Sequence, residues 1–310
     1  MAEGLGDVRL ADADRAEEDD RLARVKPAQG SQVPDLGCRR FRGGGEVELF
    51  QGDLLLDPHR TVRTSQRRNH TMAHTLNLWR RQLGEVPPSV WERTDLDVLI
   101  LADNGLTHLP PEIGRLRQLT TLDLGHNRLT TLPAELGQLT GLSGFLYLHD
   151  NDLTEIPDTL GDLTRLRYLN VGENQITALP ETLSHMTGLI ELRARHNQLA
   201  ALPDSIGSLG DLRELWLRGN AIADLPSSTA SLRALRHLDL RENTLAELPE
   251  AIAALPLLRQ VDVRSNHLTR LPEWIVDMPA LEKLDLRWNA CSPSPALLDK
   301  LGRRGCVVLL

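Results

Sequence analysis

The feature that most constrains the fold of this chain is an asparagine that returns every 23 residues. Seven of the eight intervals between these asparagines are 23 residues and one is 24, and a proline follows each of the first eight at a similar distance. A fixed period of this length indicates a repeat array, in which each unit packs on its neighbours. The nine positions are Asn104, Asn127, Asn151, Asn174, Asn197, Asn220, Asn243, Asn266 and Asn289.

The residues around each asparagine predict one short strand per unit. In the segment LTTLDLGHNRLTTLPAELGQ (119–138), alternating leucines mark one face of a strand. The next strand arrives 23 residues later in the same direction, which predicts a parallel sheet. The asparagine amide can donate to and accept from backbone groups at the corner where the chain leaves the strand. The proline favours extended or tight-turn structure on the return path.

The consensus LxxLxLxxNxLxxLPxxLG resembles the leucine-rich repeat family, in the 23-residue LPxxIGxL form of bacterial and Ras-group proteins. This resemblance implies an α/β fold: a curved leucine-rich-repeat solenoid, or horseshoe, with a parallel β-sheet on the concave face and irregular or 3-10 turns on the convex side. The segment LNLWRRQLGEVPPSVW (76–91) fits the same template, except that Arg81 replaces the asparagine. About ten units are therefore expected, because a terminal repeat is usually atypical.

Three segments are predicted along the chain. Residues 1–71 show no sustained periodicity and are expected to be a disordered or poorly ordered N-terminal extension. Residues 72–289 are expected to form the solenoid. Residues 290–310 are expected to form a C-terminal cap, with a short helix that begins at Ser294 and a final strand in the sequence CVVLL.

Composition and charge exclude several classes of function. The net charge of −8 argues against a general nucleic-acid or anionic-membrane surface, and no run of apolar residues is long enough to span a membrane. Three scattered cysteines favour a reducing, cytoplasmic compartment. No phosphate-binding loop, nucleophile elbow or complete metal motif occurs, since the two histidines of HTMAH (70–74) lack the glutamate of a zinc-protease helix. We expect no catalysis, no cofactor and no metal.

The outward side chains of the strands form the candidate binding surface. Five consecutive units carry arginine two residues after the position between the alternating leucines, and several of the rare aromatic residues occupy outward positions. Large aromatic residues and arginine are the usual anchors of protein–protein contacts. The candidate protein-binding residues are Phe145, Tyr147, Tyr168, Arg193, Arg195, Trp216, Arg218, Asp239, Arg241, Asp262, Arg264 and Arg287.

Two interpretations of the arginines stay open. In the last three units an aspartate lies beside each arginine, so these pairs could serve only to keep the face soluble. Arg193, Arg195 and Arg218 have no aspartate at the position between the leucines, which favours a binding role, although Glu191 and Glu214 lie near enough to offset their charge.

These patterns predict a monomeric, non-catalytic scaffold that recognises a protein or peptide partner on its concave β-face. One alternative is a secreted bacterial effector that acts inside a host cell, with residues 1–71 as its export signal. A second alternative, regulation of a small GTPase, follows from the family resemblance alone.

Overall fold

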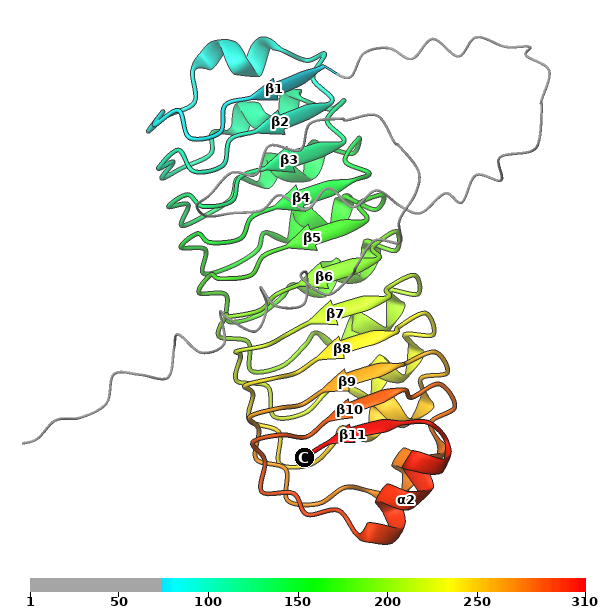
Figure 1. Cartoon of the computed structure of the whole chain (residues 1–310). Helices are drawn as coiled ribbons and strands as arrows, with labels where there is room; N and C mark the ends of the chain where they lie inside the picture. Colours follow the sequence, from blue (N-terminus) through cyan, green and yellow to red (C-terminus); the bar gives the residue numbers. More distant parts are fainter. Residues whose placement is uncertain (1–73) are drawn as a thin grey trace, which may run out of the picture. The chain divides into compact units, whose positions relative to one another are not determined.

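The computed structural model describes residues 74–310, so the predicted N-terminal extension and its boundary at residue 71 lie outside the described residues. Within that range, eleven parallel strands form one sheet in chain order, as Figure 1 shows. The strands are β1 (Thr75–Asn77), β2 (Val98–Ile100), β3 (Thr121–Asp123), β4 (Phe145–Tyr147), β5 (Tyr168–Asn170), β6 (Glu191–Arg193), β7 (Glu214–Trp216), β8 (His237–Asp239), β9 (Gln260–Asp262), β10 (Lys283–Asp285) and β11 (Val307–Leu309).

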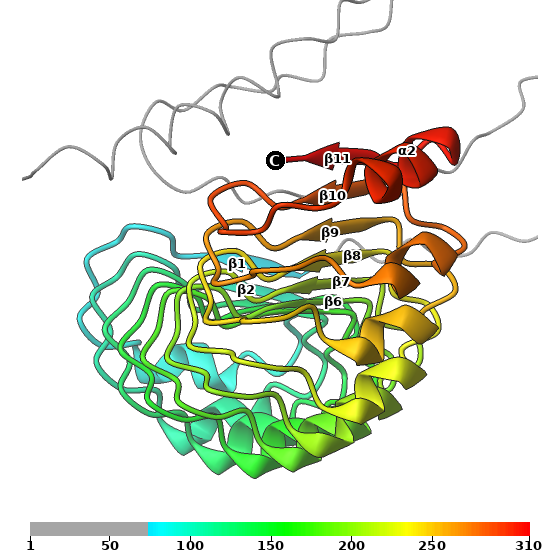
Figure 2. The same ribbon diagram turned by 90° about the horizontal axis from the view of Figure 1, so that it is seen from below.

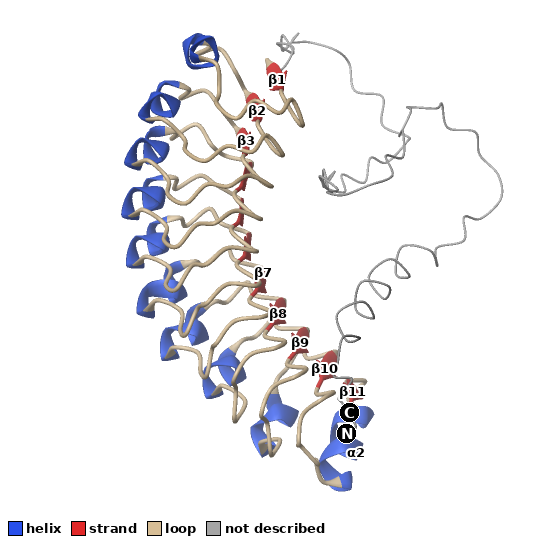
Figure 3. Cartoon of the chain, turned by 90° about the vertical axis from the view of Figure 1, so that its left-hand side faces the viewer, coloured by secondary structure: helices blue, strands red, loops and turns tan. Residues whose placement is uncertain are grey.

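A short 3-10 helix follows each of the first nine strands. Across the repeat array, the strands line the concave side of an arc and the 3-10 helices line its convex side (Figures 2 and 3). A proline precedes each 3-10 helix, where its fixed φ suits an extended entry to the turn. The helices are η1 (Pro88–Glu92), η2 (Pro111–Arg115), η3 (Ala134–Gln138), η4 (Asp158–Asp162), η5 (Glu181–His185), η6 (Asp204–Ser208), η7 (Ser227–Ser231), η8 (Glu250–Ala254) and η9 (Glu273–Asp277). This arrangement confirms the predicted fold class.

Leucine stacks fill the space between the sheet and the 3-10 helices. The central residue of each strand points inward and pairs in register with its equivalent in the next strand, as Leu99, Leu122 and Leu146 do. All three are fully buried. Because each repeat contributes a leucine, or in β9 a valine, at the same height, the core is continuous from one unit to the next, which a single repeat could not achieve.

Each repeat asparagine joins two neighbouring units. The Nδ2 group of Asn174 donates to the carbonyls of Val171 and Gly172 in its own turn and to that of Leu148 in the preceding repeat. Its Oδ1 accepts from the backbone N–H of Leu153 at 3.0 Å. The same pattern recurs from Asn127 to Asn289. The predicted role of the asparagine, to satisfy backbone groups at the corner, is confirmed.

The residue directly before each asparagine adopts a left-handed conformation. Its φ lies between 50° and 69° in all nine repeats that carry the asparagine, for example 55° at Glu173 and 59° at Trp288. Only one of the nine, Gly219, is a glycine. The asparagine network holds the turn in a conformation that other residues adopt less readily.

The C-terminal residues cover the last repeat. Helix α2 (Pro295–Arg303) begins after Ser294, whose Oγ accepts from the backbone N–H of Leu297. Leu297 and Leu301 are buried against the core, and β11 pairs with β10. Among residues 74–310, no helix has the length and apolar character needed to cross a membrane.

Candidate functional site: the concave face of the sheet

Four columns of side chains run along the concave face, across the strands. The first two columns come from the first and last residues of each strand, such as Phe145 and Tyr147 in β4. The third column lies two residues after the second, and the fourth is the left-handed residue before the asparagine. Strand alternation places the first two columns on the face opposite the buried leucines.

The predicted aromatic residues lie together. The rings of Phe145, Tyr147 and Tyr168, on β4 and β5, have centroids 5.1–6.0 Å apart. Both tyrosines are 8% exposed, and Phe145 is half-buried. Burial raises the pKa of Tyr168 to about 12, although the nearby Arg193 opposes the shift. The two hydroxyls therefore stay protonated at neutral pH.

Arg193 extends this cluster to the next strands. Its guanidinium carbon lies 5.5 Å from the ring centroid of Tyr168 and 5.5 Å from that of Trp216. The Trp216 ring stacks in turn on His237, with centroids 5.4 Å apart. We call the set Phe145, Tyr147, Tyr168, Arg193 and Trp216 the aromatic stripe. It crosses four consecutive strands, β4 to β7, through ring contacts and cation–π contacts.

Arg193, Arg195 and Arg218 each pair with a glutamate. Arg193 pairs with Glu191, whose Oε1 lies 2.5 Å from its Nε. The other two pair with residues of the fourth column: Arg195 with Glu173 at 3.7 Å and Arg218 with Glu242 at 2.8 Å. Glu173 and Glu242 lie outside the second and third columns, and the left-handed turn brings their fourth column beside the third.

The last three aspartate–arginine pairs form one connected network. Arg241 binds Asp239 and also lies 3.7 Å from Asp262, and Arg264 lies between Asp262 and Asp285 in the same way. Arg287 completes the row by pairing with Asp285 at 2.9 Å. We call these six residues the Asp–Arg network: Asp239, Arg241, Asp262, Arg264, Asp285 and Arg287.

The aspartates of the Asp–Arg network also accept hydrogen bonds from backbone N–H groups. Oδ1 of Asp239 accepts the N–H of Arg241, and Asp262 and Asp285 make the equivalent bond two residues on. Asp123 and Asn170 do the same in earlier repeats. Asp285 is 1% exposed and Arg264 is 8% exposed. These observations favour a structural role for this part of the predicted site.

Trp288 is absent from the candidate residues named above, yet it is the aromatic side chain with the greatest exposure among residues 74–310. It is 61% exposed, and the guanidinium carbons of Arg264 and Arg287 lie 5.6 Å and 5.4 Å from its ring centroid. Its position immediately before Asn289 is the sequence signal that could have identified it, since the same column supplies Glu173 and Glu242.

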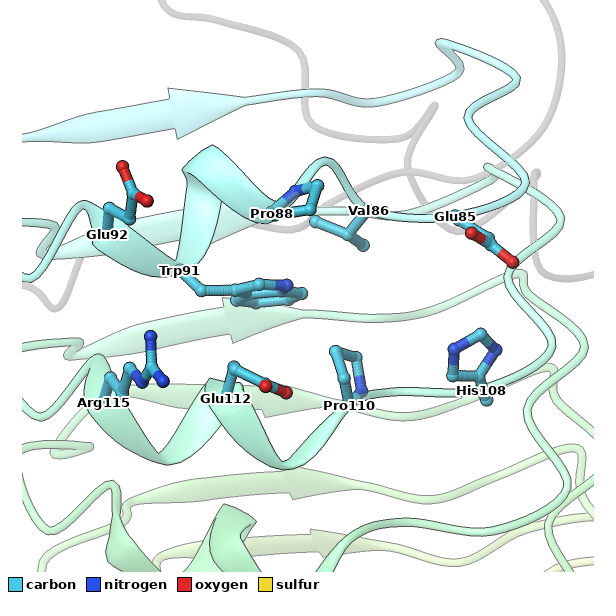
Figure 4. A pocket seen from close by; sticks show the side chains of 9 residues that line it. All are labelled: Glu85, Val86, Pro88, Trp91, Glu92, His108, Pro110, Glu112 and Arg115. Atoms are coloured by element: carbon cyan, nitrogen blue, oxygen red, sulfur yellow. The ribbon is translucent and has the colours of Figure 1, made fainter.

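A pocket of about 310 Å³ lies between the first two 3-10 helices, away from the concave face (Figure 4). Trp91 lies at its centre, and carboxylates from Glu85, Glu92 and Glu112 surround it together with His108. None of the candidate binding residues lines this pocket. Residues 74–310 also contain no group of three or more His, Cys, Asp or Glu side chains placed to hold a metal ion.

Family models match most of the described residues. A model described as a leucine-rich repeat region matches residues 204–303, and a leucine-rich repeat model matches residues 94–153 and 144–199. No curated protein matches the sequence.

Several solved structures are similar to this chain. A leucine-rich repeat protein of Leptospira interrogans is 27% identical, with a TM-score of 0.62, over 78% of this chain and 73% of that one. The leucine-rich repeat domain of the type III effector XopL is 29% identical, with a TM-score of 0.58, over 66% and 72%. A plant peptide hormone receptor in complex with RGF2 is 26% identical, with a TM-score of 0.56, over 72% of this chain but 45% of the receptor.

Proposed function

This chain belongs to the leucine-rich repeat family, and from that premise we propose that it is a non-catalytic scaffold that binds a protein or peptide on its concave β-face. The family and its fold are typically non-catalytic. The similarity to a receptor solved in complex with RGF2 supports a protein or peptide as the class of partner. The two cysteines of the described range are free thiols, which supports a reducing, cytoplasmic setting.

The observation that carries the proposal is the aromatic stripe. Its residues come from four strands that the fold places side by side, and Phe145 and Trp216 are only partly buried. A rigid sheet that holds aromatic faces in fixed positions loses little conformational entropy on binding. Interface anchors are enriched in tyrosine, tryptophan and arginine, the residue types that make up most of this stripe.

The pairing of the arginines defines the chemistry of the partner. Because Arg193 and Arg218 are bound to glutamates, a partner gains little by offering them a second carboxylate. Arg195 is more exposed, at 34%, and lies 3.7 Å from Glu173. We propose a partner segment that packs apolar or aromatic side chains on Phe145 and Trp216 and places a carboxylate near Arg195.

A peptide-display selection on the full chain tests this function. Each selected peptide is measured again on a Trp216→Ala variant and on a Trp274→Ala variant. Trp274 is a half-buried tryptophan of η9, on the convex side, and provides a matched control. We expect Trp216→Ala to weaken binding at least tenfold and Trp274→Ala to leave it unchanged. Selected peptides that bind both variants as tightly as the parent would contradict the proposal.

One comparison favours a second candidate function. The similarity to the repeat domain of the type III effector XopL supports a secreted bacterial effector that binds its partner inside a host cell. A secretion assay that compares the full chain with a version beginning at Met72 tests this candidate. Secretion of the full chain alone would support an export signal within residues 1–71, and secretion of neither would oppose it. The small-GTPase alternative gains no support from these comparisons.

A further inference from the structure

Two histidines of adjacent repeats meet beside the aromatic stripe. Nε2 of His126 and Nε2 of His149 are 3.2 Å apart, with ring centroids 4.7 Å apart and the rings nearly perpendicular. The other nitrogen of His126, Nδ1, lies 2.5 Å from Oδ2 of Asp150. His149 also contacts Tyr147 edge-on, with the centroids 6.0 Å apart. The sequence motifs did not indicate this pair, because 23 residues separate the two histidines.

The local backbone makes room for this arrangement. A Cβ atom on Gly125 would lie 2.5 Å from Cε1 of His149, so the glycine leaves the space that the imidazole occupies. Burial, helped by the charges of Arg195 and Arg193 and by that of His126 when it is protonated, lowers the pKa of His149 to about 4, although Asp150 opposes the shift.

The 3.2 Å between the two Nε2 atoms is a hydrogen-bond distance, so one nitrogen donates and the other accepts unless an ion takes the place of the proton. Asp150 draws the proton of neutral His126 to Nδ1, which leaves the Nε2 lone pair directed at His149. A proton shared between the two Nε2 atoms is one solution. The second is a cation, since two imidazoles bound at 2.0–2.1 Å to one tetrahedral metal have nitrogens about 3.3 Å apart.

We propose that His126 and His149 bind one divalent transition-metal ion of the zinc and copper group through their Nε2 atoms, with Asp150 as the carboxylate that orients His126. Imidazole is a preferred ligand of these metals. A carboxylate on the second nitrogen of a ligating histidine is the usual arrangement around such ions.

The remaining coordination positions belong to water. No third His, Cys, Asp or Glu side chain of residues 74–310 is placed to complete the set. The His126 side chain is 35% exposed and that of Asp150 is 54% exposed, so solvent reaches the site. The ion therefore has two protein ligands and open coordination positions. Its site lies on the same face as the aromatic stripe and needs no partner.

Titration calorimetry of the untagged full chain with Zn²⁺ tests the site. We expect His126→Ala and His149→Ala each to weaken the affinity more than tenfold, and Asp150→Asn to weaken it about 10- to 100-fold. His196→Ala is the matched control, because His196 lies in the fourth column like His126, three repeats along. Its affinity for Zn²⁺ should equal that of the parent.

A spectroscopic measurement separates ligation from a change in stability. With Cu²⁺ as the probe, the electron paramagnetic resonance spectrum of the parent should show coupling to two imidazole nitrogens, and His126→Ala should show one fewer. Melting curves verify that each variant folds, and Gly125→Ala, which displaces the His149 ring, replaces His149→Ala if that variant does not fold. Zn²⁺ affinity that is unchanged in both histidine variants would mean adventitious binding elsewhere and would overturn the proposal, as would a parent chain that binds no Zn²⁺.

Discussion

Each repeat asparagine links its own turn to the preceding repeat, because its side chain both donates and accepts hydrogen bonds. Asn174 bonds four backbone groups, three carbonyls and one N–H. These groups are buried, so no water can replace the side chain when it is lost. One residue type thus fixes the corner of the strand and the spacing of the repeats.

Replacement of Asn174 by alanine should destabilise the chain by at least about 3 kcal/mol, because each buried backbone group left without a partner costs about 1–3 kcal/mol. Urea unfolding followed by circular dichroism measures the loss. Gln175→Ala, at the exposed neighbouring position, is the control and should leave the midpoint nearly unchanged. Equal midpoints for the two variants would show that the asparagine network does not hold the repeats together.

Asp123 offers a test at a single titrating group. Burial raises the pKa of this carboxyl above its ordinary value, although the N–H of Gly125 opposes the shift. The folded state therefore binds a proton more readily than the unfolded state, and stability falls as the pH rises from the unfolded pKa, near 4, through the folded pKa. Above that window the carboxylate is charged and buried.

Asp123→Asn should consequently stabilise the chain at pH 7, because an amide keeps the hydrogen bond to Gly125 without the charge. Asn170 makes this bond at the equivalent position, with its Oδ1 3.0 Å from the N–H of Gly172. The gain should shrink when the pH falls below the unfolded pKa. Urea midpoints of the parent and the variant at pH 3.5 and pH 7 measure the difference, and a variant less stable than the parent at pH 7 would contradict this interpretation.

At the scale of elements, the Asp–Arg network ties β8, β9 and β10 to one another across the concave face. Burial opposes ionisation of Asp285, but hydrogen bonds from Arg287 and the charges of Arg287 and Arg264 together lower its pKa. Arg264 contacts the carboxylates of Asp262 in β9 and Asp285 in β10, so the loss of one aspartate affects two repeats.

Asp285→Ala should destabilise the chain by roughly 3 kcal/mol, near the lower end for breaking a buried ion pair, because Arg287 remains partly exposed. Glu247→Ala is the control: Glu247 pairs with Arg270 on the surface, where both side chains are more than half exposed. Chemical unfolding should show a lower free energy of unfolding for Asp285→Ala and an unchanged one for Glu247→Ala. A loss of the same size in both would argue that the network adds nothing beyond surface pairing.

The sequence predicted the elements well because the repeat pattern constrains them strongly. Leucine recurs at every second position of the strand, and asparagine recurs every 23 residues. A parallel stack of strands buries these leucines and gives hydrogen-bond partners to the backbone groups at the turn. The ion pairs depend instead on side-chain conformations and on the left-handed turn, which brings Glu173 beside Arg195 of the next repeat and Glu242 beside Arg218 of the preceding repeat. The His126–His149 contact arises from the same turn and has no short motif.

At the scale of the repeat unit, the solenoid needs a cover at its last repeat. Leu297, Leu301 and Cys306 are buried in the same hydrophobic core as Leu284 of β10. A chain that ends at Asn289 should unfold at a lower temperature and self-associate, because the exposed leucines then face solvent. Differential scanning calorimetry and light scattering measure both effects. A truncated chain that stays monomeric with an unchanged melting temperature would show that residues 290–310 are not a cap.

The candidate binding surface could be predicted only in part from the sequence. The alternation of the strands placed Phe145, Tyr168 and Trp216 on the outward face, and the structure brings the first two into contact. The sequence could not distinguish arginines that face a partner from arginines bound within the sheet, because that difference depends on burial and on the position of each glutamate.

Footprinting of the full chain with and without a display-selected peptide shows whether the aromatic stripe is the binding surface. Hydroxyl-radical labelling reports the solvent exposure of individual aromatic side chains. The peptide should protect Phe145 and Trp216 and leave Trp274 on the convex side unchanged. Protection of Trp274 with no change at Phe145 and Trp216 would contradict that expectation.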